Sequence, residues 1–377
     1  MLSKYRPLFE PLALNNGVTV HNRLAAAPLT LFSSNPDGSV SDGERMFLTT
    51  HSERIGLYIL GATLVQPDGQ AFATQPRAIS EADLDALAER AVLVKQGGGK
   101  AVLQIHHGGA QALPELTGTV PSVPSALQDG QHEMSAEEVT ALIESFGRAT
   151  ELAIRAGFDG VEIHGANNYI LQQFYSAATN HRQDEWGGSP EKRLRFPLAV
   201  VDTVCAARAK LQRPDFIVGY RLSPEEPGEE GLTMTETLDL VEALCGKPLQ
   251  YLHISLWDFY KKARRGKGAG EPRLKLIHDQ IAGRLPLIGV GNLFNADDLV
   301  AALNSGRCEF VALGKSLMIN PRIATLIYEG RESELIGELD PHTPGHYGIP
   351  QPLWEMCVKG GAWLPPVKGL PHQNLDL

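Results

Sequence analysis

The stretch GVEIHGANNYILQQF, residues 160–174, begins like a buried β-strand and ends in polar side chains that a strand does not need for its structure. Val161 and Ile163 suit a sheet that is covered by helices. His164, Asn167 and Tyr169 follow within six residues and bring an imidazole, an amide and a phenol to the end of this segment. All three groups can donate hydrogen bonds, and the imidazole and the phenol can also transfer protons. Their grouping predicts a catalytic or binding site at the end of a strand.

Short apolar segments that alternate with helix-length amphipathic segments supply a framework for this site. The eight segments are 23–29, 57–65, 100–107, 160–166, 216–223, 249–255, 286–292 and 308–315. Ser80, Ser135 and Thr233 each lie three residues before an acidic residue, which is the spacing of a capping box at a helix N-terminus. Eight strands alternating with helices close a parallel sheet into a barrel. The sequence therefore predicts an α/β protein, a single (β/α)8 TIM barrel with an N-terminal cap and a C-terminal extension.

The domain organisation follows from the same pattern. We expect one barrel over residues 1–337, with residues 1–22 as the cap, because no linker is apparent before residue 330. The extension, residues 338–377, is rich in Pro and Gly yet contains Trp354 and Trp363. Two indoles left in solvent would expose a large apolar area. We therefore expect the extension to pack on the barrel or on a partner subunit, and the protein to be a homo-oligomer, either a dimer or a tetramer.

Polar groups are expected at one mouth of the barrel, because TIM barrels carry their catalytic groups at the C-terminal ends of the strands. In chain order, the other strand ends carry Thr30, Ala62, Gln104, His106, His107, Arg221, Ser255, Trp257, Gly291, Asn292, Gly314 and Lys315. The stretches GVGN and LGK follow the last two strands, where TIM barrels commonly bind a phosphate. A cofactor that carries a phosphate is the natural inference.

Four longer stretches resemble motifs of one known family. They are NRLAAAPLTLFSS (22–34), QIHHGG (104–109), VEIHGANNYILQQF (161–174) and NHRQDEWGGSPEKR (180–193). These stretches are similar to those of the old yellow enzymes, the FMN-dependent ene-reductases, over roughly residues 6–325. The resemblance implies bound FMN, NADPH or NADH as the electron donor, and a small activated alkene as the substrate.

The resemblance also implies roles for individual residues. Those expected to hold FMN are Ala27, Pro28, Leu29, Thr30, Ala62, Gln104, His164, Arg221, Gly291, Asn292, Gly314 and Lys315. Within this set, Thr30 would donate to the C4 carbonyl of the flavin, and Arg221 would stabilise the negative charge of the reduced form. Those expected around the substrate are Phe32, His164, Asn167, Tyr169 and Trp257.

A mechanism for the reduction of an enone or enal follows from this resemblance. His164 and Asn167 would direct two N–H donors at the substrate carbonyl, and loss of one such donor typically costs about 10²–10³ in rate. Flavin N5 would deliver hydride to the β-carbon from one face, and Tyr169 would protonate the α-carbon from the other. Without the resemblance, Tyr169 would more often be a packing residue with a satisfied hydroxyl. His164 could be a structural histidine, an interpretation that Asn167 beside it argues against. His106 and His107 receive no assigned role.

Arg221 needs an anionic partner, because an unpaired guanidinium in a barrel core is prohibitively costly. That partner would be the reduced flavin or Glu162, which lies two residues before His164 and so on the same face of the strand. We therefore expect the Glu162 carboxylate to face the barrel interior.

Several positions depart from the family pattern. Thr30 and Phe32 stand where one subgroup has Cys and Tyr, so a redox-sensitive thiol and a phenol are missing. Lys315 replaces the usual Arg, which keeps the charge but loses the bidentate fork. Ala110 replaces a common Arg and leaves the details of the loop 108–134 open.

Composition narrows the partners and the location. The net charge of −10 argues against nucleic acid or an anionic membrane surface as a partner. No run of about 18 apolar residues and no signal peptide is recognised, so we expect a cytoplasmic protein. Cys205, Cys245, Cys308 and Cys357 lie too far apart for a zinc or iron–sulfur site, and no bound metal is expected.

The basic stretch YKKARRGKGAG, residues 260–270, follows the sixth predicted strand on the active face. Its cations could bind the phosphates of NAD(P)H. A solvated, mobile loop is the alternative interpretation.

Other functions stay open at this point. One is an FMN-dependent dehydrogenase that oxidises an amine or another C–H donor, although Tyr169 favours the reductase. A metal-dependent hydrolase using His106, His107 and His164 lacks a carboxylate cluster, and a non-catalytic flavin-binding protein is the remaining alternative.

Overall fold

The computed structural model describes residues 1–371 and confirms the barrel. Within these residues the closed sheet contains β3 (Leu24–Ala26), β4 (Leu57–Leu64), β5 (Lys100–His106), β8 (Gly160–Gly165), β9 (Ile217–Leu222), β10 (Tyr251–Ile254), β11 (Leu287–Gly289) and β12 (Phe310–Leu313). All neighbouring strands are parallel, including β12 and β3, which close the barrel. Each predicted apolar segment contains one of these strands.

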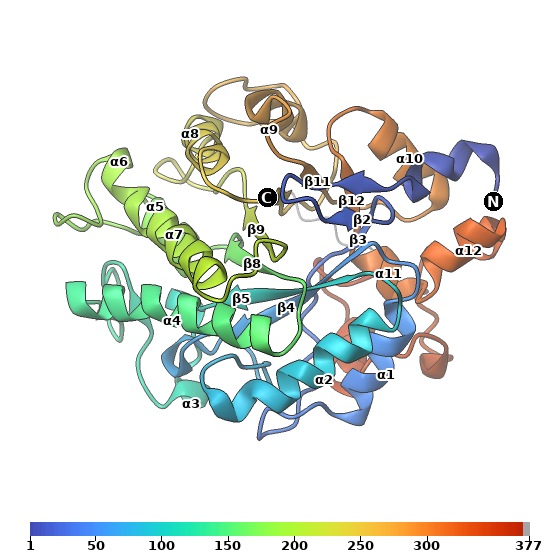
Figure 1. The fold of residues 1–377 in the computed structure, drawn as a ribbon, viewed down its shortest axis with the longest axis horizontal. Helices are drawn as coiled ribbons and strands as arrows, with labels where there is room; N and C mark the ends of the chain where they lie inside the picture. The colour runs from blue at the N-terminus through green and yellow to red at the C-terminus, as the bar shows by residue number, and fades with distance from the viewer. Residues whose placement is uncertain (372–377) are drawn as a thin grey trace.

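Helices cover the outside of the barrel (Figure 1). The main ones are α1 (Asp42–His51), α2 (Leu84–Lys95), α4 (Ala136–Arg155), α7 (Arg195–Lys210), α8 (Met234–Cys245), α9 (Arg273–Ile281), α10 (Ala296–Asn304) and α12 (Ile323–Glu329). The predicted capping boxes are present at Ser80, Ser135 and Thr233. The box at Ser80 opens a short 3-10 turn, Glu81–Asp83, that leads into α2.

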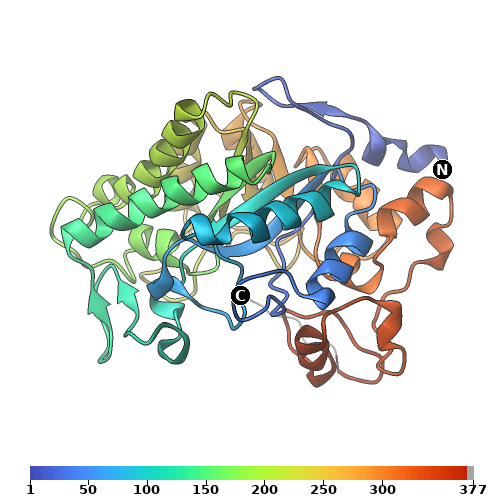
Figure 2. The same ribbon diagram turned by 60° about the horizontal axis from the view of Figure 1, so that its bottom comes forward.

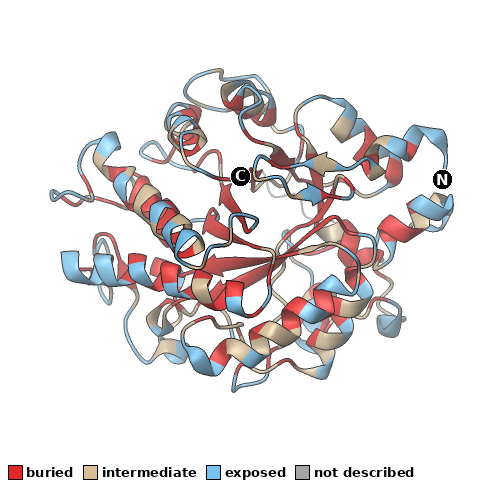
Figure 3. Ribbon diagram, viewed as in Figure 1, coloured by how far each residue is buried: buried red, intermediate tan, exposed pale blue. Residues whose placement is uncertain are grey.

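The core lies between the strands and the inner faces of the helices, as the buried residues in Figure 3 show. Every residue of β4 is buried, as expected for a parallel strand with side chains packed on both faces. On α4, the buried Val139, Leu142 and Phe146 recur at helical spacing and turn one face to the barrel. Burying each large apolar side chain contributes about 1.5–3 kcal/mol, and this packing holds the strand ends in place.

The N-terminal cap closes the end of the barrel opposite the strand C-termini. It consists of a 3-10 helix, Ser3–Phe9, and a hairpin of β1 (Leu12–Ala13) and β2 (Thr19–Val20). The Asn15 side chain donates to the Leu249 carbonyl at 2.7 Å. Leu14 packs with Ile217 and Tyr251 in the lower part of the barrel interior. The expected cap is therefore confirmed.

The C-terminal extension folds against the body of the same chain (Figure 2). Its helix α13 (Gln351–Lys359) places Leu353, Trp354 and Cys357 in a cluster with Met318 of α11 (Lys315–Ile319). Trp354 is 7% exposed, whereas Trp363 is 41% exposed. It stays a prediction that the extension also contacts a partner subunit. The domain boundary at residue 337 stays a prediction as well. The predicted extension runs to residue 377, and its last residues, 372–377, lie outside the described residues.

Among residues 1–371, none of the helices combines the length and the apolar character needed to cross a bilayer.

Candidate active site

The strand ends of the parallel barrel meet at one mouth, and three neighbouring strands bring the expected polar side chains together. His164 of β8 lies opposite Arg221 of β9, which in turn lies opposite His253 of β10. On the other side of β8, Glu162 lies opposite Gln104 of β5. The predicted His164, Gln104 and Arg221 therefore belong to one continuous surface.

Tyr169 stands in a cluster of rings at this mouth. Its ring centroid lies 5.0 Å from that of His164 and 4.4 Å from that of His106, which it meets edge to face. Tyr169 is the residue that precedes helix α5 (Ile170–Tyr175). Asn167 and Asn168 both have φ near 58°, a left-handed conformation that asparagine tolerates better than most residues. This sharp turn returns the phenol toward the strand end that carries His164.

His106 is a functional candidate to which the sequence analysis assigned no role. Its Nδ1 accepts a hydrogen bond from Gln75 Nε2 at 3.0 Å. Gln75 is fixed in this orientation because its Oε1 accepts from the Ala71 N–H and its Nε2 also donates to the Ala62 carbonyl. The proton of a neutral His106 must therefore sit on Nε2, which has no hydrogen-bond partner among residues 1–371.

Strand periodicity could have identified His106. Residues 104 and 106 share one face of β5, so His106 lies on the side of Gln104. His107 lies on the opposite side, where its Nδ1 accepts from the Gly109 N–H and its Nε2 faces Asp68 at 3.4 Å. His107 therefore has a structural role, and only His106 reaches the ring cluster.

Burial sets the protonation states of these rings. It lowers the pKa of His164 well below its usual range, and it lowers the pKa of His106 to about 3. Burial also raises the pKa of Tyr169 to about 12, despite the opposing effect of Arg221. At neutral pH the site thus presents two uncharged imidazoles and a protonated phenol.

Asn167 lies at the solvent side of the mouth and is exposed. Its Oδ1 accepts a hydrogen bond of 2.7 Å from the Ser255 hydroxyl, which follows β10. The amide nitrogen is thereby left as the group that can donate to a substrate. The pairing of His164 and Asn167 on one carbonyl oxygen stays a prediction.

Glu162 faces the barrel interior, as expected. It accepts hydrogen bonds from Gln104 Nε2 at 2.8 Å, from the Tyr251 hydroxyl at 3.1 Å and from His253 Nδ1 at 2.9 Å. Burial raises the pKa of Glu162, but His253, Arg221 and Gln104 outweigh it and hold the pKa below the usual range. Glu162 is therefore an ionised carboxylate within the barrel.

The polar atoms left without partners test whether the mouth suits FMN. Arg221 Nε, His164 Nδ1 and Asn292 Oδ1 are buried and lack a hydrogen-bond partner within residues 1–371. A buried guanidinium nitrogen without a partner is costly unless a ligand supplies an acceptor. The donors and acceptors at the mouth thus fit a cofactor with a polar ring edge.

The predicted phosphate residues follow β11 and β12. Gly291 has φ of 133°, and a Cβ there would lie 2.6 Å from the backbone carbon of Asp258, so only glycine fits. At Gly314, the nearest neighbour of an added Cβ is 3.8 Å away. Lys315 donates to the Ala362 carbonyl of the extension at 3.0 Å and lies 5.5 Å from the Trp257 ring. The sequence did not predict the Ala362 carbonyl as a partner of Lys315. The Lys315 ammonium group has three N–H donors, so it can bind this carbonyl and still donate to a phosphate.

The loop after β3 carries the predicted Pro28, Leu29, Thr30 and Phe32, all of them partly buried. Ala27 at its start is buried and donates to the Leu313 carbonyl at 2.9 Å. The Phe32 ring lies 5.8 Å from Phe72 and 6.5 Å from Trp363 of the extension.

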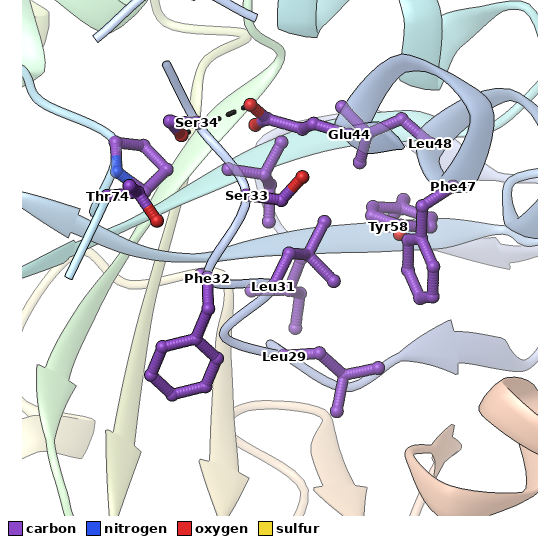
Figure 4. Close-up of a pocket in the computed structure, with 14 residues that line it drawn as sticks. Leu29, Leu31, Phe32, Ser33, Ser34, Glu44, Phe47, Leu48, Tyr58 and Thr74 are labelled. Atoms are coloured by element: carbon purple, nitrogen blue, oxygen red, sulfur yellow. Dashed lines mark hydrogen bonds between the residues drawn. The ribbon is translucent and has the colours of Figure 1, made fainter. Parts of the chain in front are cut away.

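The buried ion pair of Arg90 and Glu44 anchors this loop. Arg90 donates to Glu44 at 2.7 Å. Ser34 of the loop donates to the same carboxylate at 3.1 Å, the bond dashed in Figure 4. The narrow pocket drawn in Figure 4 lies between the loop, α1 and β4. It is bordered by Leu29 and Phe32 but by none of the polar residues assigned to chemistry, so we do not regard it as the substrate site.

The basic loop 260–270 is anchored. The Arg265 guanidinium donates to the carbonyls of Glu226, Glu229 and Gly231. The backbone N–H groups of Arg264 and Arg265 donate to the Glu225 carboxylate. The Arg265 side chain is thus bound to backbone carbonyls rather than solvated. The mobility of the loop and its role in binding NAD(P)H stay open. Lys262, Arg264 and Lys267 keep exposed side chains.

The protein is thus a (β/α)8 barrel with polar side chains gathered at the C-terminal ends of its strands. The chain belongs to the NADH:flavin oxidoreductase / NADH oxidase family, which it matches over residues 7–334.

Individual relatives support this assignment. The chain is 44% identical to a probable NADH-dependent flavin oxidoreductase, YqiG, of Bacillus subtilis, over 97% of this chain and 99% of that protein. The structure of an old yellow enzyme homologue from Zymomonas mobilis superposes with a TM-score of 0.76 at 25% identity, covering 91% of this chain and 99% of that one. Morphinone reductase gives a TM-score of 0.74 at 27% identity, covering 93% and 97%. The expected resemblance to old yellow enzymes is confirmed, and the protein is an oxidoreductase with FMN as its cofactor and NAD(P)H as its electron donor.

One group of relatives is much longer than this chain. The NADH:fumarate oxidoreductase of Klebsiella pneumoniae is 35% identical over 93% of this chain, but the match spans only 39% of that protein.

Proposed function

We propose that this protein reduces the C=C bond of small activated alkenes, enones or enals, with electrons from NADH or NADPH. The observation that supports this function best is the Tyr169 phenol standing against His106 and beside His164 at the barrel mouth. A pKa of about 12 keeps this phenol protonated at neutral pH. A positioned neutral acid beside hydrogen-bond donors is what protonation of a carbon next to a polarised carbonyl requires.

The reaction divides between the protein and its cofactor. When bound, FMN would supply the hydride-transfer chemistry between the nicotinamide and the alkene. His164 and the amide nitrogen of Asn167 donate to the substrate carbonyl oxygen and draw electron density from the β-carbon. Tyr169 gives its phenolic proton to the α-carbon and recovers a proton from solvent. The alkene thus gains one hydride and one proton.

The remaining predicted residues bind and shape the site in this proposal. Gln104, Thr30 and Arg221 would bind the polar edge of the flavin. Ala27, Pro28, Leu29 and Ala62 would line the ring, and Gly291, Asn292, Gly314 and Lys315 would hold its phosphate. Phe32 and Trp257 would form walls for the substrate. The homo-oligomeric state and the cytoplasmic location stay predictions.

Replacing Tyr169 by Phe tests the function directly. The reduction of the enzyme by NAD(P)H should continue at the wild-type rate, because the phenol takes no part in that step. The reaction of the reduced enzyme with 2-cyclohexenone should slow by about 10²–10⁴-fold, the usual contribution of a general acid. Anaerobic stopped-flow spectroscopy of each half-reaction separates the two rates.

Tyr175→Phe is the matched control, because the Tyr175 hydroxyl donates to the Glu236 carbonyl, outside the ring cluster. It should leave both half-reactions unchanged. An enzyme that is reduced by an amine, and whose reduced form does not react with 2-cyclohexenone, would instead be the FMN-dependent dehydrogenase of the alternative interpretation.

A further inference from the structure

Glu162 is a buried charge for which the proposed reaction has no direct use. Its side chain is fully buried on β8, and its two oxygens receive hydrogen bonds from three side chains on neighbouring parts of the barrel: Gln104, Tyr251 and His253. So many donors around one carboxylate stabilise its charged form. A barrel interior that only needed packing would be better filled by an apolar residue.

The opposite charge that Glu162 can influence at the barrel mouth is the Arg221 guanidinium. Arg221 lies on β9, opposite His164 of β8 and His253 of β10. Burial lowers the pKa of Arg221, and the negative charge of Glu162 opposes this effect. Arg221 Nε has no hydrogen-bond partner within residues 1–371, and Glu162 acts on the guanidinium through charge attraction. The other titratable groups facing this region are His164 and His253, whose pKa values burial lowers, and Tyr169 and Tyr251, whose pKa values burial raises. Glu162 and Arg221 are therefore opposite charges that attract each other across the barrel interior, while the direct hydrogen bonds of Glu162 come from Gln104, Tyr251 and His253.

Glu162 also fixes the amide of Gln104. Because Gln104 Nε2 donates to Glu162, its Oε1 must point the other way, toward Gly61 of β4. A Cβ at Gly61 would lie only 2.7 Å from Gln104 Oε1, so the glycine leaves this oxygen free. The amide thus presents an acceptor at the mouth, suitable for an N–H group on the edge of a flavin ring.

We propose that Glu162 is a positioning residue for the cofactor: it orients the Gln104 amide and offsets the charge of Arg221, which keeps the reduction potential of bound FMN low. This inference rests on FMN lying at the barrel mouth beside Arg221, as in the proposed function.

The direction of the effect follows from charge balance. Reduction of the flavin adds negative charge near Arg221, and an uncompensated guanidinium would favour that reduced form. The negative charge of Glu162 opposes this preference. A lower potential makes the reduced cofactor a stronger hydride donor toward weakly activated alkenes. The same effect makes its reduction by NAD(P)H slower.

Glu162→Gln tests the charge while conserving the shape of the side chain. The reduction equilibrium of the FMN-loaded variant should shift at least tenfold toward the reduced form, which for a two-electron couple is about 30 mV upward. The measurement is anaerobic equilibration against a redox dye, which needs no alkene. Glu226→Gln is the matched control: Glu226 is also buried and accepts hydrogen bonds from Gln172, Ser176 and the Leu232 backbone, but it lies outside the network around Arg221. It should lower stability and leave the potential unchanged.

The half-reactions give a second readout that a purely structural role would not produce. Glu162→Gln should speed the reduction by NAD(P)H and slow the reaction with 2-cyclohexenone, whereas general damage to the site would slow both. An unchanged or lowered potential in a variant that retains FMN would overturn the inference. If the potential rises but the wild type reduces no alkene, the proposed function fails and the role of Glu162 stands.

Tyr251→Phe provides a second test of the proposal if the Glu162→Gln variant does not fold. Loss of one hydrogen-bond donor makes the Glu162 carboxylate easier to protonate, so the potential should exceed that of the wild type at pH 5 and converge with it at pH 8. A potential that follows the wild type at both pH values would contradict the proposal.

Discussion

At the scale of single residues, the site depends on neutral side chains held in one orientation. Gln75 assigns the proton of His106 to Nε2, and burial keeps this imidazole uncharged. The edge-to-face contact of 4.4 Å between His106 and Tyr169 then limits the directions in which the phenol can point. We regard His106 as a positioning residue for Tyr169.

Replacing His106 by Leu should therefore slow the reaction of the reduced enzyme with 2-cyclohexenone by up to about tenfold, since an aromatic pair is worth about 0.5–1.5 kcal/mol. The rate of reduction by NAD(P)H should not change. His106→Phe should restore most of the loss, because it keeps a ring against the phenol. His107→Leu is the control, since His107 faces Asp68. Equal effects of the His106→Leu and His107→Leu variants would exclude this role.

At the scale of elements, short loops with defined anchors place the functional side chains. The loop after β3 is held by Ser34, Glu44 and Arg90, and the turn before α5 is made by Asn167 and Asn168. Glu225, just after β9, binds the backbone of the basic loop 260–270. The polar residues at the mouth thus owe their positions to contacts several residues away from the chemistry.

The contacts that anchor the basic loop decide which of its residues should be replaced to test whether it binds NAD(P)H. Simultaneous removal of all its cations would also remove Arg265, which supports the fold through backbone carbonyls. Replacing only Lys262 and Arg264 by Ala leaves that support intact. If these side chains bind the phosphates of the nicotinamide, the KM for NADPH should rise about tenfold and its dependence on salt should weaken. An unchanged KM at low and high salt would show that they do not.

At the scale of the whole molecule, packing of the barrel, its helices and the extension buries several titratable groups away from water. Residues 1–22 close one end of the barrel, and the extension packs against α11 near the other. His51 of α1 and His106 of β5 are both fully buried, and burial lowers the pKa of each to about 3. Such groups make the stability of the protein depend on pH.

The sign of this dependence is fixed by proton binding. In the unfolded chain these histidines take up protons near pH 6.5, whereas in the folded chain they stay neutral until about pH 3. Between these values the unfolded state binds more protons, so stability is fully present above pH 6.5 and is lost as the pH falls. We expect the free energy of unfolding to decrease by about 1.4 kcal/mol in total for each histidine between pH 7.5 and pH 5.5.

Urea denaturation between pH 7.5 and pH 5.5 measures this loss of stability, in a range where most carboxylates remain ionised. The His51→Leu variant should lose less unfolding free energy over this pH range, by the amount that one histidine contributes. A free energy of unfolding that stays constant over this range would refute the expectation.

The sequence by itself determined the barrel, because parallel strands buried on both faces must be continuous apolar runs, and capping boxes mark where helices begin. It also determined that His164, Gln104, Arg221 and Glu162 share the barrel interior, because side chains alternate along a strand. The family followed from long motifs, and the expectation for Glu162 was confirmed by its three hydrogen bonds.

Only the tertiary structure decided which polar groups serve as partners for one another. Gln75 meets His106 across 31 positions of the chain, and Lys315 meets Ala362 across 47. Arg265 turns inward to backbone carbonyls, although its sequence context looks like a solvated cationic run. Contacts of this kind depend on how loops from separate strands fold over the same mouth. Local propensity and spacing carry no information about that arrangement, because it is set by packing between distant segments.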